Sequence, residues 1–326
     1  MTEARRGHVL VAGVTTRALA ISAARAGYRV TAIDAFGDLD LQAAADVIVL
    51  RPEPGTRFTP FEAAGAAEAV TADFAAYTSN FENYPDAVAR LAQGRRLLGN
   101  PPDVLVQVRN PIGLMRMLRR RGFATPRTRA AAGTAPGTWL LKPRRSGGGH
   151  GTTVWRRGWP VPRSRYLQER IDGAPGSVVF AADGRDAVPL ALTRQLVADP
   201  NFGAHGFRYC GSMLGSPSSL FPHGEKLLEI AAALASSVTR EFGLVGLNGI
   251  DFMAREGVPY PIEVNPRFSG SMELVERIHD LPMFELHVRA CNQALPMAAP
   301  LGGGVEGKAI VFARRDVRLG DTRGWM

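Results

Sequence analysis

Residues 243–272 have the sequence GLVGLNGIDFMAREGVPYPIEVNPRFSGSM, which predicts a β-hairpin followed by a loop. Residues 250–253 form the first predicted strand and residues 260–265 the second, because both are mostly apolar, aromatic or β-branched. The four residues between them, 254–257, end in a glycine that relaxes the backbone of a turn. An antiparallel pair of strands is therefore the element from which the rest of the fold can be placed.

Three oxygen-bearing side chains converge on one face of this hairpin. If the hairpin is symmetric about Gly257, Asp251 lies opposite Glu263 and Gly249 lies opposite Asn265, so Asp251, Glu263 and Asn265 share a face. Facing carboxylates repel each other, and a bound cation removes that cost. Carboxylate and amide oxygens suit a hard ion such as Mg²⁺, so these three residues are the predicted metal ligands. A surface hairpin with solvated acids is the competing interpretation.

Arg267 lies two residues beyond Asn265, where a guanidinium beside a metal suits phosphate or carboxylate. Asp251, followed by the sequence EVNPR at 263–267, resembles the metal-binding end of the ATP-grasp ligases. The resemblance implies that Asp251, Glu263 and Asn265 hold two Mg²⁺ ions, with Mn²⁺ as the alternative, on the phosphates of ATP. It also implies a catalytic role for Arg267, which would hold the reacting carboxylate or acyl phosphate.

A lysine on a strand and a glycine-rich loop precede the hairpin. Residues 138–143 predict a strand that carries Lys142, and residues 146–151, SGGGHG, predict a loop. Backbone N–H groups in such a loop can close over phosphates, although a flexible hairpin turn is the competing interpretation. The pair resembles the ATP-grasp pattern, which implies a catalytic and ATP-binding Lys142 and further ATP contacts from Ser146, Gly147, Gly148, Gly149 and His150.

Residues 166–173, YLQERIDG, predict a strand that turns into a segment containing glycine. This stretch resembles the adenine-binding hinge of the same family. The resemblance implies that the backbone at Gln168 and Ile171 contacts the adenine edge. It also implies that Glu169 or Asp172 reaches the ribose or the amino group of the nucleotide.

Candidate contacts to the other substrates lie elsewhere. Residues 201–219 are rich in Gly, Ser and Pro, predict no regular structure, and form a loop of a length that is usually functional. His205 and Arg208 lie in this loop. Arg194 is expected to end a strand together with Gln195, and both are expected to face the cleft. Ser269 is the fourth candidate.

The first hundred residues predict a parallel sheet. Strands at 8–13 and 28–34 flank a helix at 15–26, which makes a βαβ unit, and further strands are predicted at 46–50 and 75–78. A βαβ unit whose second strand ends in an acid invites a dinucleotide-binding interpretation, but residues 13–17 lack the G-x-G-x-x-G pattern. ATP-grasp proteins commonly carry such a Rossmann-like domain in front, where it shapes the substrate cleft.

These elements predict an α/β protein, with an α+β ATP-grasp core behind a Rossmann-like parallel-sheet domain. The expected domains are residues 1–103, a small ATP-grasp subdomain with the glycine loop at 104–170, and a C-terminal subdomain with the metal site at 171–326. Many ATP-grasp enzymes place a phosphate-binding lysine just before the helix predicted at 111–121. This chain has Arg109 there, so the first ATP-contacting cation is left open.

Composition favours small-molecule ligands over macromolecular ones. Of the 326 residues 45% are hydrophobic, and the net charge of +9 comes mainly from arginine. No basic stretch is interleaved with aromatic residues, and no apolar run approaches the roughly 20 residues that span a bilayer. We therefore expect no nucleic-acid or membrane partner. Two cysteines without a metal-binding spacing and a start unlike a signal peptide favour a reduced, cytoplasmic protein.

The predicted function is an ATP-dependent carboxylate–amine ligase that acts through an acyl phosphate. Its expected partners are a small-molecule carboxylate and amine, with a homodimer as an expected assembly. The segment GVTTRALAISAARAGYRVTAIDAFGDLDL resembles predicted carboligases related to biotin carboxylase, a branch that includes amine–glutamate ligases of methanofuran-type cofactor synthesis. Two alternatives stay open: an NAD-dependent oxidoreductase that uses residues 8–34, and a non-catalytic nucleotide-binding relative.

Overall fold

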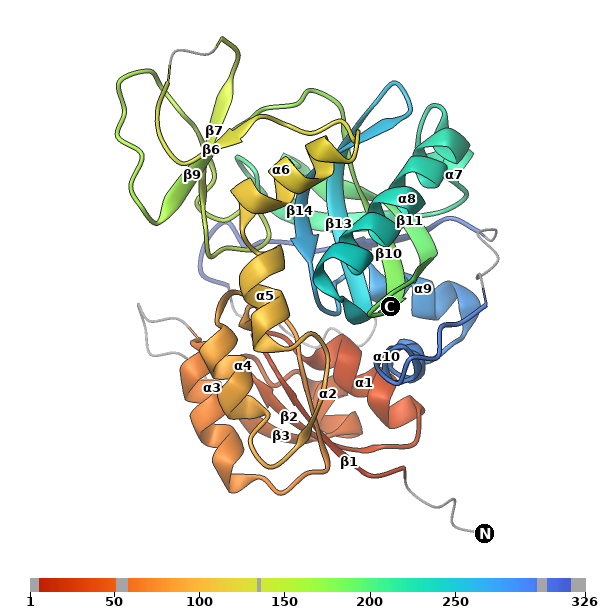
Figure 1. Ribbon diagram of the computed structural model, residues 1–326. Helices are drawn as coiled ribbons and strands as arrows, with labels where there is room; N and C mark the ends of the chain where they lie inside the picture. Colours follow the sequence, from red (N-terminus) through yellow and green to blue (C-terminus); the bar gives the residue numbers. More distant parts are fainter. Residues whose placement is uncertain (1–5, 51–57, 134–135, 298–303, 318–326) are drawn as a thin grey trace.

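The computed structural model describes residues 6–50, 58–133, 136–297 and 304–317, which form three β-sheets surrounded by helices (Figure 1). A five-stranded parallel sheet comes first, and a four-stranded and a six-stranded antiparallel sheet follow it. This arrangement confirms the predicted α/β class, in which a parallel sheet precedes an α+β core. Among the described residues, no helix has both the length and the apolar character that a membrane crossing needs.

The parallel sheet has the strand order β3-β2-β1-β4-β5. Its strands are β1 (His8–Ala12), β2 (Arg29–Asp34), β3 (Asp46–Val49), β4 (Phe74–Tyr77) and β5 (Arg96–Leu98). The connections contain α1 (Arg17–Arg25), α2 (Leu39–Ala44), α3 (Pro60–Ala66), α4 (Pro85–Leu91) and the 3₁₀ turns η1 (Ala67–Ala69) and η2 (Phe81–Asn83). We call these strands and connections the N-terminal unit.

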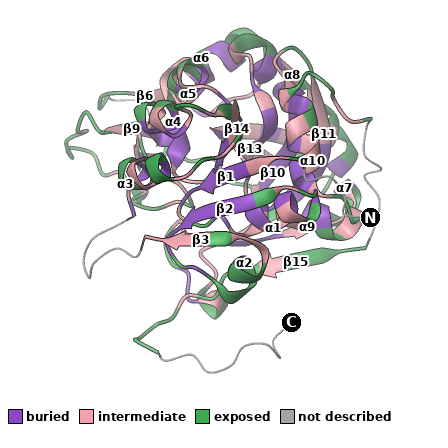
Figure 2. Cartoon of the chain, turned by 90° about the horizontal axis from the view of Figure 1, so that it is seen from below, coloured by how far each residue is buried: buried purple, intermediate pink, exposed green. Residues whose placement is uncertain are grey.

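Helices cover both faces of this sheet, so its central strands β1, β2 and β4 are buried except at their first residues (Figure 2). Val9 and Val11 of β1 pack with α1, whereas Leu10 and Ala12 pack on the opposite face with α3 and α4. A parallel sheet covered on both faces requires such continuous apolar strands. The strands predicted at 8–13, 28–34, 46–50 and 75–78 are confirmed to within two residues. β5 was not predicted, because its three residues pair with one neighbour only and lie among glycines and prolines.

The six-stranded sheet forms the centre of the molecule, with the strand order β14-β13-β10-β11-β12-β15. Its strands are β10 (Ala174–Asp183), β11 (Ala187–Val197), β12 (Tyr209–Leu214), β13 (Val245–Arg255), β14 (Val258–Asn265) and β15 (Glu306–Ala309). One face packs against α8 (Gly224–Phe242) and the other against α9 (Met272–His279) and α10 (Met283–Cys291). Alternate residues of β10 serve the two layers: Val178 and Phe180 face α8, and Val179 and Ala181 face α10.

The four-stranded sheet is a small layer that stands apart in Figure 1, with the order β6-β9-β7-β8. Its strands are β6 (Thr128–Arg129), β7 (Trp139–Pro143), β8 (Thr153–Val154) and β9 (Arg165–Glu169). The helices α5 (Pro102–Val108) and α6 (Pro111–Arg120) connect it to the N-terminal unit. Its buried cluster consists of Trp139, Leu141 and Leu167. A layer with so small a core can shift more readily than the two large sheets.

The interpretation of residues 201–219 as a loop without regular structure is wrong. The segment from 200 contains a 3₁₀ turn, η3 (Pro200–Phe202), then β12 and the short helix α7 (Pro217–Leu220). β12 pairs with β11 on one side and β15 on the other, although it has only six residues and includes Gly211. Pairing with the preceding strand β11 and with the distant strand β15 supplied the order that the local sequence did not indicate.

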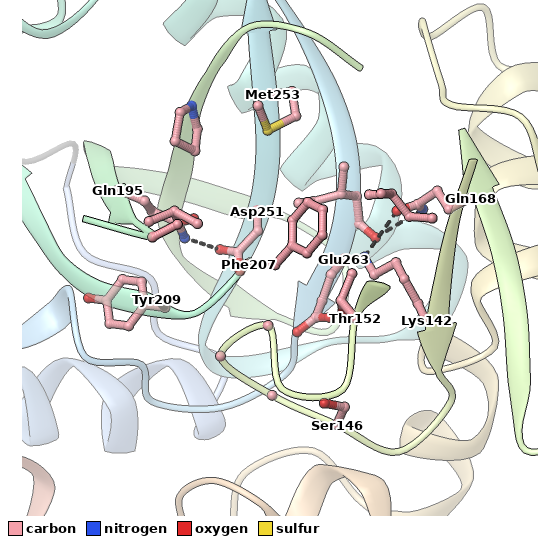
Figure 3. Close-up of a pocket in the computed structure, with 18 of the residues that line it drawn as sticks. Lys142, Ser146, Thr152, Gln168, Gln195, Phe207, Tyr209, Asp251, Met253 and Glu263 are labelled. Atoms are coloured by element: carbon pink, nitrogen blue, oxygen red, sulfur yellow. Dashed lines mark hydrogen bonds between the residues drawn. The ribbon is translucent and has the colours of Figure 1, made fainter. Parts of the chain in front are cut away.

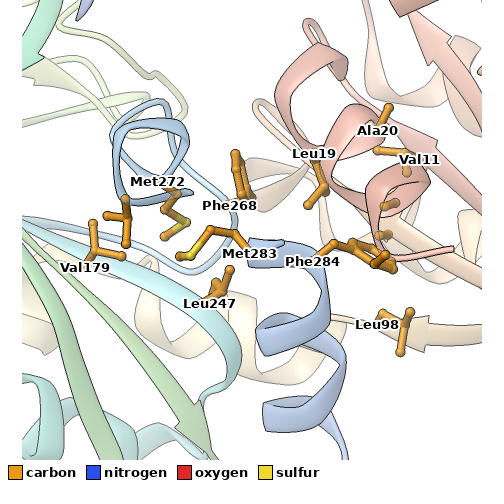
Figure 4. Packing of buried hydrophobic residues seen from close by; sticks show 14 of the residues in the cluster. Val11, Leu19, Ala20, Leu98, Val179, Leu247, Phe268, Met272, Met283 and Phe284 are labelled. Atoms are coloured by element: carbon orange, nitrogen blue, oxygen red, sulfur yellow. The ribbon is translucent and has the colours of Figure 1, made fainter. Parts of the chain in front are cut away.

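A continuous hydrophobic core joins the N-terminal unit to the central sheet (Figure 4). Leu19 of α1 and Phe284 of α10 belong to the same buried cluster as Val179, Leu247 and Met272. The parallel sheet therefore sits in a fixed position against the central sheet, and side chains from its loops can contribute to a site beside that sheet.

Asn100 makes a polar connection across the same junction. Its Nδ2 donates to Asn248 Oδ1 (2.8 Å) and to the carbonyl of Pro266 (3.0 Å), and its Oδ1 accepts from the N–H of Val245 (2.9 Å). Asn100 is 1% exposed, so these partners have no access to solvent there. The junction thus depends on a buried amide whose hydrogen bonds are satisfied by protein.

Replacing Asn100 should therefore be costly. We expect Asn100→Ala to lower the free energy of unfolding by at least about 2 kcal/mol, because several buried polar groups lose their partner. Urea unfolding followed by circular dichroism measures this change. The control is Asn201→Ala at an exposed position, which should stay within about 0.5 kcal/mol of the wild type. Equal stability of the two variants would contradict the structural role of Asn100.

Candidate active site

A cavity of about 450 Å³ lies between the small sheet and the central sheet (Figure 3). Ligand pockets of small-molecule enzymes typically have this size. Strands β7 and β9 form one wall, and β11, β13 and β14 form the floor and the opposite wall. The loops at 146–149 and 206–209 and the segment 267–271 border it. The cavity thus lies where the three predicted motifs meet.

The cavity collects most of the residues that the sequence singled out. Those that line it are Lys142, Ser146, Gly147, Gly148, Gly149, Gln168, Glu169, Ile171, Asp172, Asp251, Glu263, Asn265, Arg267 and Ser269. His150, Arg194, His205 and Arg208 are not among its lining residues.

The proposed metal ligands lie together at the floor of the cavity. Asp251 pairs directly with Glu263, and Gly249 pairs with Asn265, in the register of β13 and β14. Asn265 Nδ2 donates to Asp251 Oδ2 (3.0 Å), and Gln195 Nε2 donates to Asp251 Oδ1 (2.9 Å; Figure 3). Neutral donors therefore orient Asp251 without cancelling its charge.

The pKa of Asp251 is raised to about 6, first by burial of the carboxyl group and then by the negative charge of Glu263. Hydrogen bonds from Ser177 and Asn265 and the charge of Arg267 act against this rise. Oxygen ligands and an unfavourable pair of charges fit a hard divalent cation. Within the described part of the chain, no group of three or more His, Cys, Asp or Glu could hold a metal ion. An ion at this floor would accordingly also take oxygens from Asn265 and from a bound ligand.

Arg109 lies behind Glu263 and not in the cavity. Its Nη1 is 3.5 Å from Glu263 Oε1 and donates to the carbonyl of Val264 (2.9 Å). Its Nη2 donates to Asn83 Oδ1 (2.8 Å) and to the carbonyl of Ser146 (3.2 Å). Because protein groups use these donors, Arg109 does not take the place of a phosphate-binding lysine in this structure. It places a positive charge beside a proposed metal ligand instead.

Lys142 lines the cavity beside the segment that resembles an adenine hinge (Figure 3). Its Nζ donates to Gln168 Oε1 (3.0 Å), and Gln168 Nε2 donates to the carbonyl of Ile262 on β14 (3.3 Å). Gln168 is 1% exposed, so its side chain ties the small sheet to the central sheet. The neutral side chain of Gln168 therefore holds the Lys142 ammonium in a position from which it could contact a phosphate of a bound ligand.

The glycine loop lies against the segment that precedes β12. The carbonyl of Gly148 accepts from the N–H of Tyr209 (3.1 Å). A Cβ atom on Gly149 would lie 1.8 Å from the carbonyl oxygen of Phe207, and the φ angle of Gly149 is +77°. Only glycine fits this contact, so the absence of a side chain lets the loop close over one end of the cavity.

Three of the four substrate candidates lie away from the cavity. Arg194 is exposed, whereas the next residue, Gln195, lines the cavity, because neighbouring residues of β11 point to opposite faces. His205 is exposed, and the guanidinium of Arg208 lies 4.7 Å above the ring of Phe312. Of the two residues expected to face the cleft at the end of this strand, Gln195 lines the cavity and Arg194 does not.

Three hydroxyl groups that the sequence analysis did not select, those of Tyr209, Ser212 and Ser271, line the cavity together with the candidate Ser269. Tyr209 and Ser212 share a hydrogen bond of 2.8 Å, and Ser269 and Ser271 share one of 3.2 Å. Burial raises the pKa of Tyr209 to about 12, so its hydroxyl stays protonated at neutral pH. The period-2 pattern of β12 could have indicated Ser212, but not that its strand borders a cavity.

The N-terminal unit does not offer a dinucleotide site. Asp34, at the end of β2, is fully buried and accepts from the N–H of Thr16 (2.6 Å), Phe36 (2.7 Å) and Gly37 (2.9 Å). A Cβ atom on Gly13 would lie 1.9 Å from Thr78 Oγ1, so the side chain of Thr78 already fills the space beside the turn after β1. Both carboxylate oxygens of Asp34 accept hydrogen bonds from protein, and Thr78 fills the turn after β1. The described residues of this unit therefore leave no room for a dinucleotide, and the oxidoreductase alternative is not supported.

A family model described as an ATP-grasp domain matches residues 109–271, half of the chain. The chain belongs to the ATP-grasp family. This match confirms the predicted family, and the predicted class of enzyme, an ATP-dependent ligase, follows from it.

Solved structures of other ATP-grasp proteins share the fold. N5-carboxyaminoimidazole ribonucleotide synthetase from Thermus thermophilus matches with a TM-score of 0.68 and 19% identity, over 91% of this chain and 82% of that one. The biotin carboxylase domain of a Hydrogenobacter thermophilus 2-oxoglutarate carboxylase, solved with MgADP and bicarbonate, matches with 0.69 and 16%, over 93% and 74%. A putative ATP-grasp protein from Archaeoglobus fulgidus matches with 0.62 and 16%, over 92% and 91%.

The contact at Gly149 predicts a local effect of substitution. We expect Gly149→Ala to separate the glycine loop from the segment at 205–209 and to speed hydrogen exchange of the Tyr209 amide at least about tenfold, because its acceptor moves away. The control is Gly147→Ala, whose Cβ would meet nothing within 4 Å, and which should leave that exchange rate unchanged. Equal protection of the Tyr209 amide in both variants would contradict the closed contact.

The raised pKa of Asp251 predicts a pH-dependent cost of folding. Between about pH 4 and pH 6 the native state binds more protons than the unfolded state, so this carboxyl lowers the unfolding free energy as pH rises. In EDTA, Asp251→Asn should therefore gain about 2 kcal/mol relative to wild type between pH 4.5 and pH 8. Denaturant unfolding at both pH values measures the gain. The exposed Asp316→Asn is the control, and a pH-independent difference for Asp251→Asn would count against the raised pKa.

Proposed function

We propose that this ATP-grasp protein is a carboxylate–amine ligase that activates a carboxylate as an acyl phosphate and passes it to an amine. The observation that carries the proposal is that Asp251, Glu263, Asn265 and Arg267 line one cavity together with Lys142 and the glycine loop. Glutamate as the carboxylate, in the synthesis of a cofactor, rests on the resemblance of the N-terminal segment alone.

Different residues of the cavity lining would bind the base, the phosphates and the metal ion of MgATP. The segment from Gln168 to Asp172 would hold the base, and Lys142 with the backbone of the glycine loop would hold the phosphates. Asp251, Glu263 and Asn265 would hold Mg²⁺, which neutralises charge on the transferred phosphoryl group and the phosphates of ATP. Mn²⁺ is the alternative ion.

Arg267 and the glycine loop would protect and orient the activated group. A guanidinium presents parallel N–H groups that match a carboxylate or phosphate. Contact between the glycine loop and the segment at 205–209 would exclude water, which competes with the amine for an acyl phosphate. The protonated hydroxyl of Tyr209, which lines the cavity and shares a hydrogen bond with Ser212, would contact the bound substrates.

One observation favours a second candidate, a nucleotide-binding relative without catalytic activity. Arg109 is committed to Glu263, Asn83 and backbone carbonyls, so the position before α6 offers no cation to the cavity. Binding of ATP without turnover, over a broad panel of acceptors, would support this candidate.

Phosphate release from MgATP, screened over pairs of carboxylates and amines with glutamate among them, tests the ligase. With an active pair, Glu263→Gln should lower kcat at least about a hundredfold, because the loss of a metal carboxylate is felt in the transition state. Glu256→Gln, an exposed acid in the turn of the same hairpin, is the matched control and should retain wild-type kcat. A fully active Glu263→Gln, or full activity in EDTA, would refute the proposed metal site.

A further inference from the structure

The 3₁₀ turn η2 of the N-terminal unit reaches the candidate active site with two neighbouring side chains. Glu82 is 1% exposed and Asn83 is 5% exposed, which is unusual for a charged residue and an amide on a short turn. Neither residue lines the cavity. Each contacts an arginine of the ATP-grasp core, and Asn83 also contacts the carbonyl of Ser146, so both can act on the site through these groups.

Glu82 holds Arg267. The Nε of Arg267 donates to Glu82 Oε1 (2.8 Å), while Nη1 donates to the carbonyl of Phe268 (3.1 Å) and Nη2 to Asn265 Oδ1 (3.2 Å). Of the five N–H groups of the guanidinium, these contacts use three. One N–H on each terminal nitrogen is left for a ligand, among the groups that the structure describes, and Arg267 borders the cavity.

The pair of Glu82 and Arg267 is buried enough to fix the guanidinium. The side chain of Arg267 is 10% exposed, and the second oxygen of Glu82 is buried without a hydrogen-bond partner. The polar contact of Glu82 is therefore the one with Arg267. Two charges held together with so little water restrict the guanidinium to one orientation.

Asn83 holds Arg109 in a similar way. Asn83 Oδ1 accepts from Nη2 (2.8 Å) and Nε (3.2 Å) of Arg109, and Asn83 Nδ2 donates to the carbonyl of Ser146 (3.3 Å). Nη1 of Arg109 then faces Glu263 Oε1 at 3.5 Å. One amide thus connects the N-terminal unit to a proposed metal ligand and to the start of the glycine loop.

We propose that Glu82 and Asn83 are positioning residues for phosphoryl transfer, Glu82 through Arg267 and Asn83 through Arg109 and Glu263. The inference rests on the proposed function and assigns the N-terminal unit a part in it. A guanidinium that meets a phosphoryl group by two hydrogen bonds, or a carboxylate that holds a cation, loses its effect when displaced by about 1 Å. The N-terminal unit thus fixes the positions of the Arg267 guanidinium and the Glu263 carboxylate, although Glu82 and Asn83 do not line the cavity themselves.

Thermal denaturation with two ligands tests the two arms of the proposal separately: the role of Glu82 through Arg267, and the role of Asn83 through Arg109 and Glu263. MgADP reports on the nucleotide and metal, and aluminium fluoride added to MgADP mimics the transferred phosphoryl group. For Glu82→Gln we expect the increase in Tm with MgADP to equal that of wild type and the further increase with aluminium fluoride to fall at least by half. Glu68→Gln, which removes an exposed acid paired with Arg90 in the same unit, is the control and should respond like wild type.

A double-mutant cycle shows whether Glu82 acts through Arg267. Arg267→Met should lose the aluminium fluoride response, and adding Glu82→Gln to it should cause no further loss. If Glu82→Gln does not fold, Glu82→Asp keeps the charge but shortens the side chain, and it should lose part of the same response. A full aluminium fluoride response in a folded Glu82 variant would overturn this arm.

The Asn83 arm has its own measurement. Asn83→Ala should raise the Mg²⁺ concentration needed for half of the ADP-dependent shift in Tm about three- to tenfold, because Glu263 loses its support. Asn83→Asp, which keeps an acceptor oxygen for Arg109, should restore most of the wild-type value, and Glu82→Gln should not change it. An unchanged Mg²⁺ requirement in Asn83→Ala would overturn this arm. Absence of any MgADP response in wild type would instead refute the proposed function and remove the basis of both arms.

Discussion

The repulsion between Asp251 and Glu263 is the constraint on which the site depends. The two carboxylates face each other across β13 and β14, where like charges destabilise a sheet. Gln195 and Asn265 orient Asp251 with neutral N–H groups, and Arg109 stands 3.5 Å from Glu263. These contacts hold the carboxylates in place while the pKa of Asp251 stays raised to about 6. The fold thus maintains an electrostatic cost that a divalent cation at the cavity floor would relieve.

The sequence predicted this pairing, but not the backbone that produces it. Symmetry about Gly257 places Asp251 opposite Glu263, and the structure has the same pairs. However, the turn is centred between Glu256 and Gly257, both with positive φ, and an irregularity after Asp251 shifts the register by one residue. A bulge of this kind moves every side chain beyond it to the other face, and a period-2 pattern does not reveal it. The hairpin and its ligand face were therefore predictable, whereas their geometry was not.

Two questions that the sequence left open are decided in the structure by contacts between distant residues. The first is whether Arg109, which lies just before α6, contacts a phosphate. Its guanidinium instead donates hydrogen bonds to residues 26, 37 and 155 positions away and does not line the cavity. Arg194 and Gln195 are adjacent and both polar, and only the position of β11 in the central sheet decides which one faces the cavity. Local patterns give an element and its two faces, but the packing of the other elements decides which face becomes the site.

The N-terminal unit shows how one architecture can serve a different purpose. In open parallel sheets, ligands bind beyond the carboxyl ends of the strands where the strand order reverses, which is between β1 and β4 in this sheet. Here Asp34 is satisfied by backbone N–H groups, and contacts between Gly13 and Thr78 fill the crevice. The chain that leaves β4 at this edge continues into η2 and delivers Glu82 to Arg267. That edge contacts the segment after β14 through Tyr77, whose hydroxyl donates to the carbonyl of Pro266, and through Glu82, so side chains placed there can support the neighbouring site that we propose.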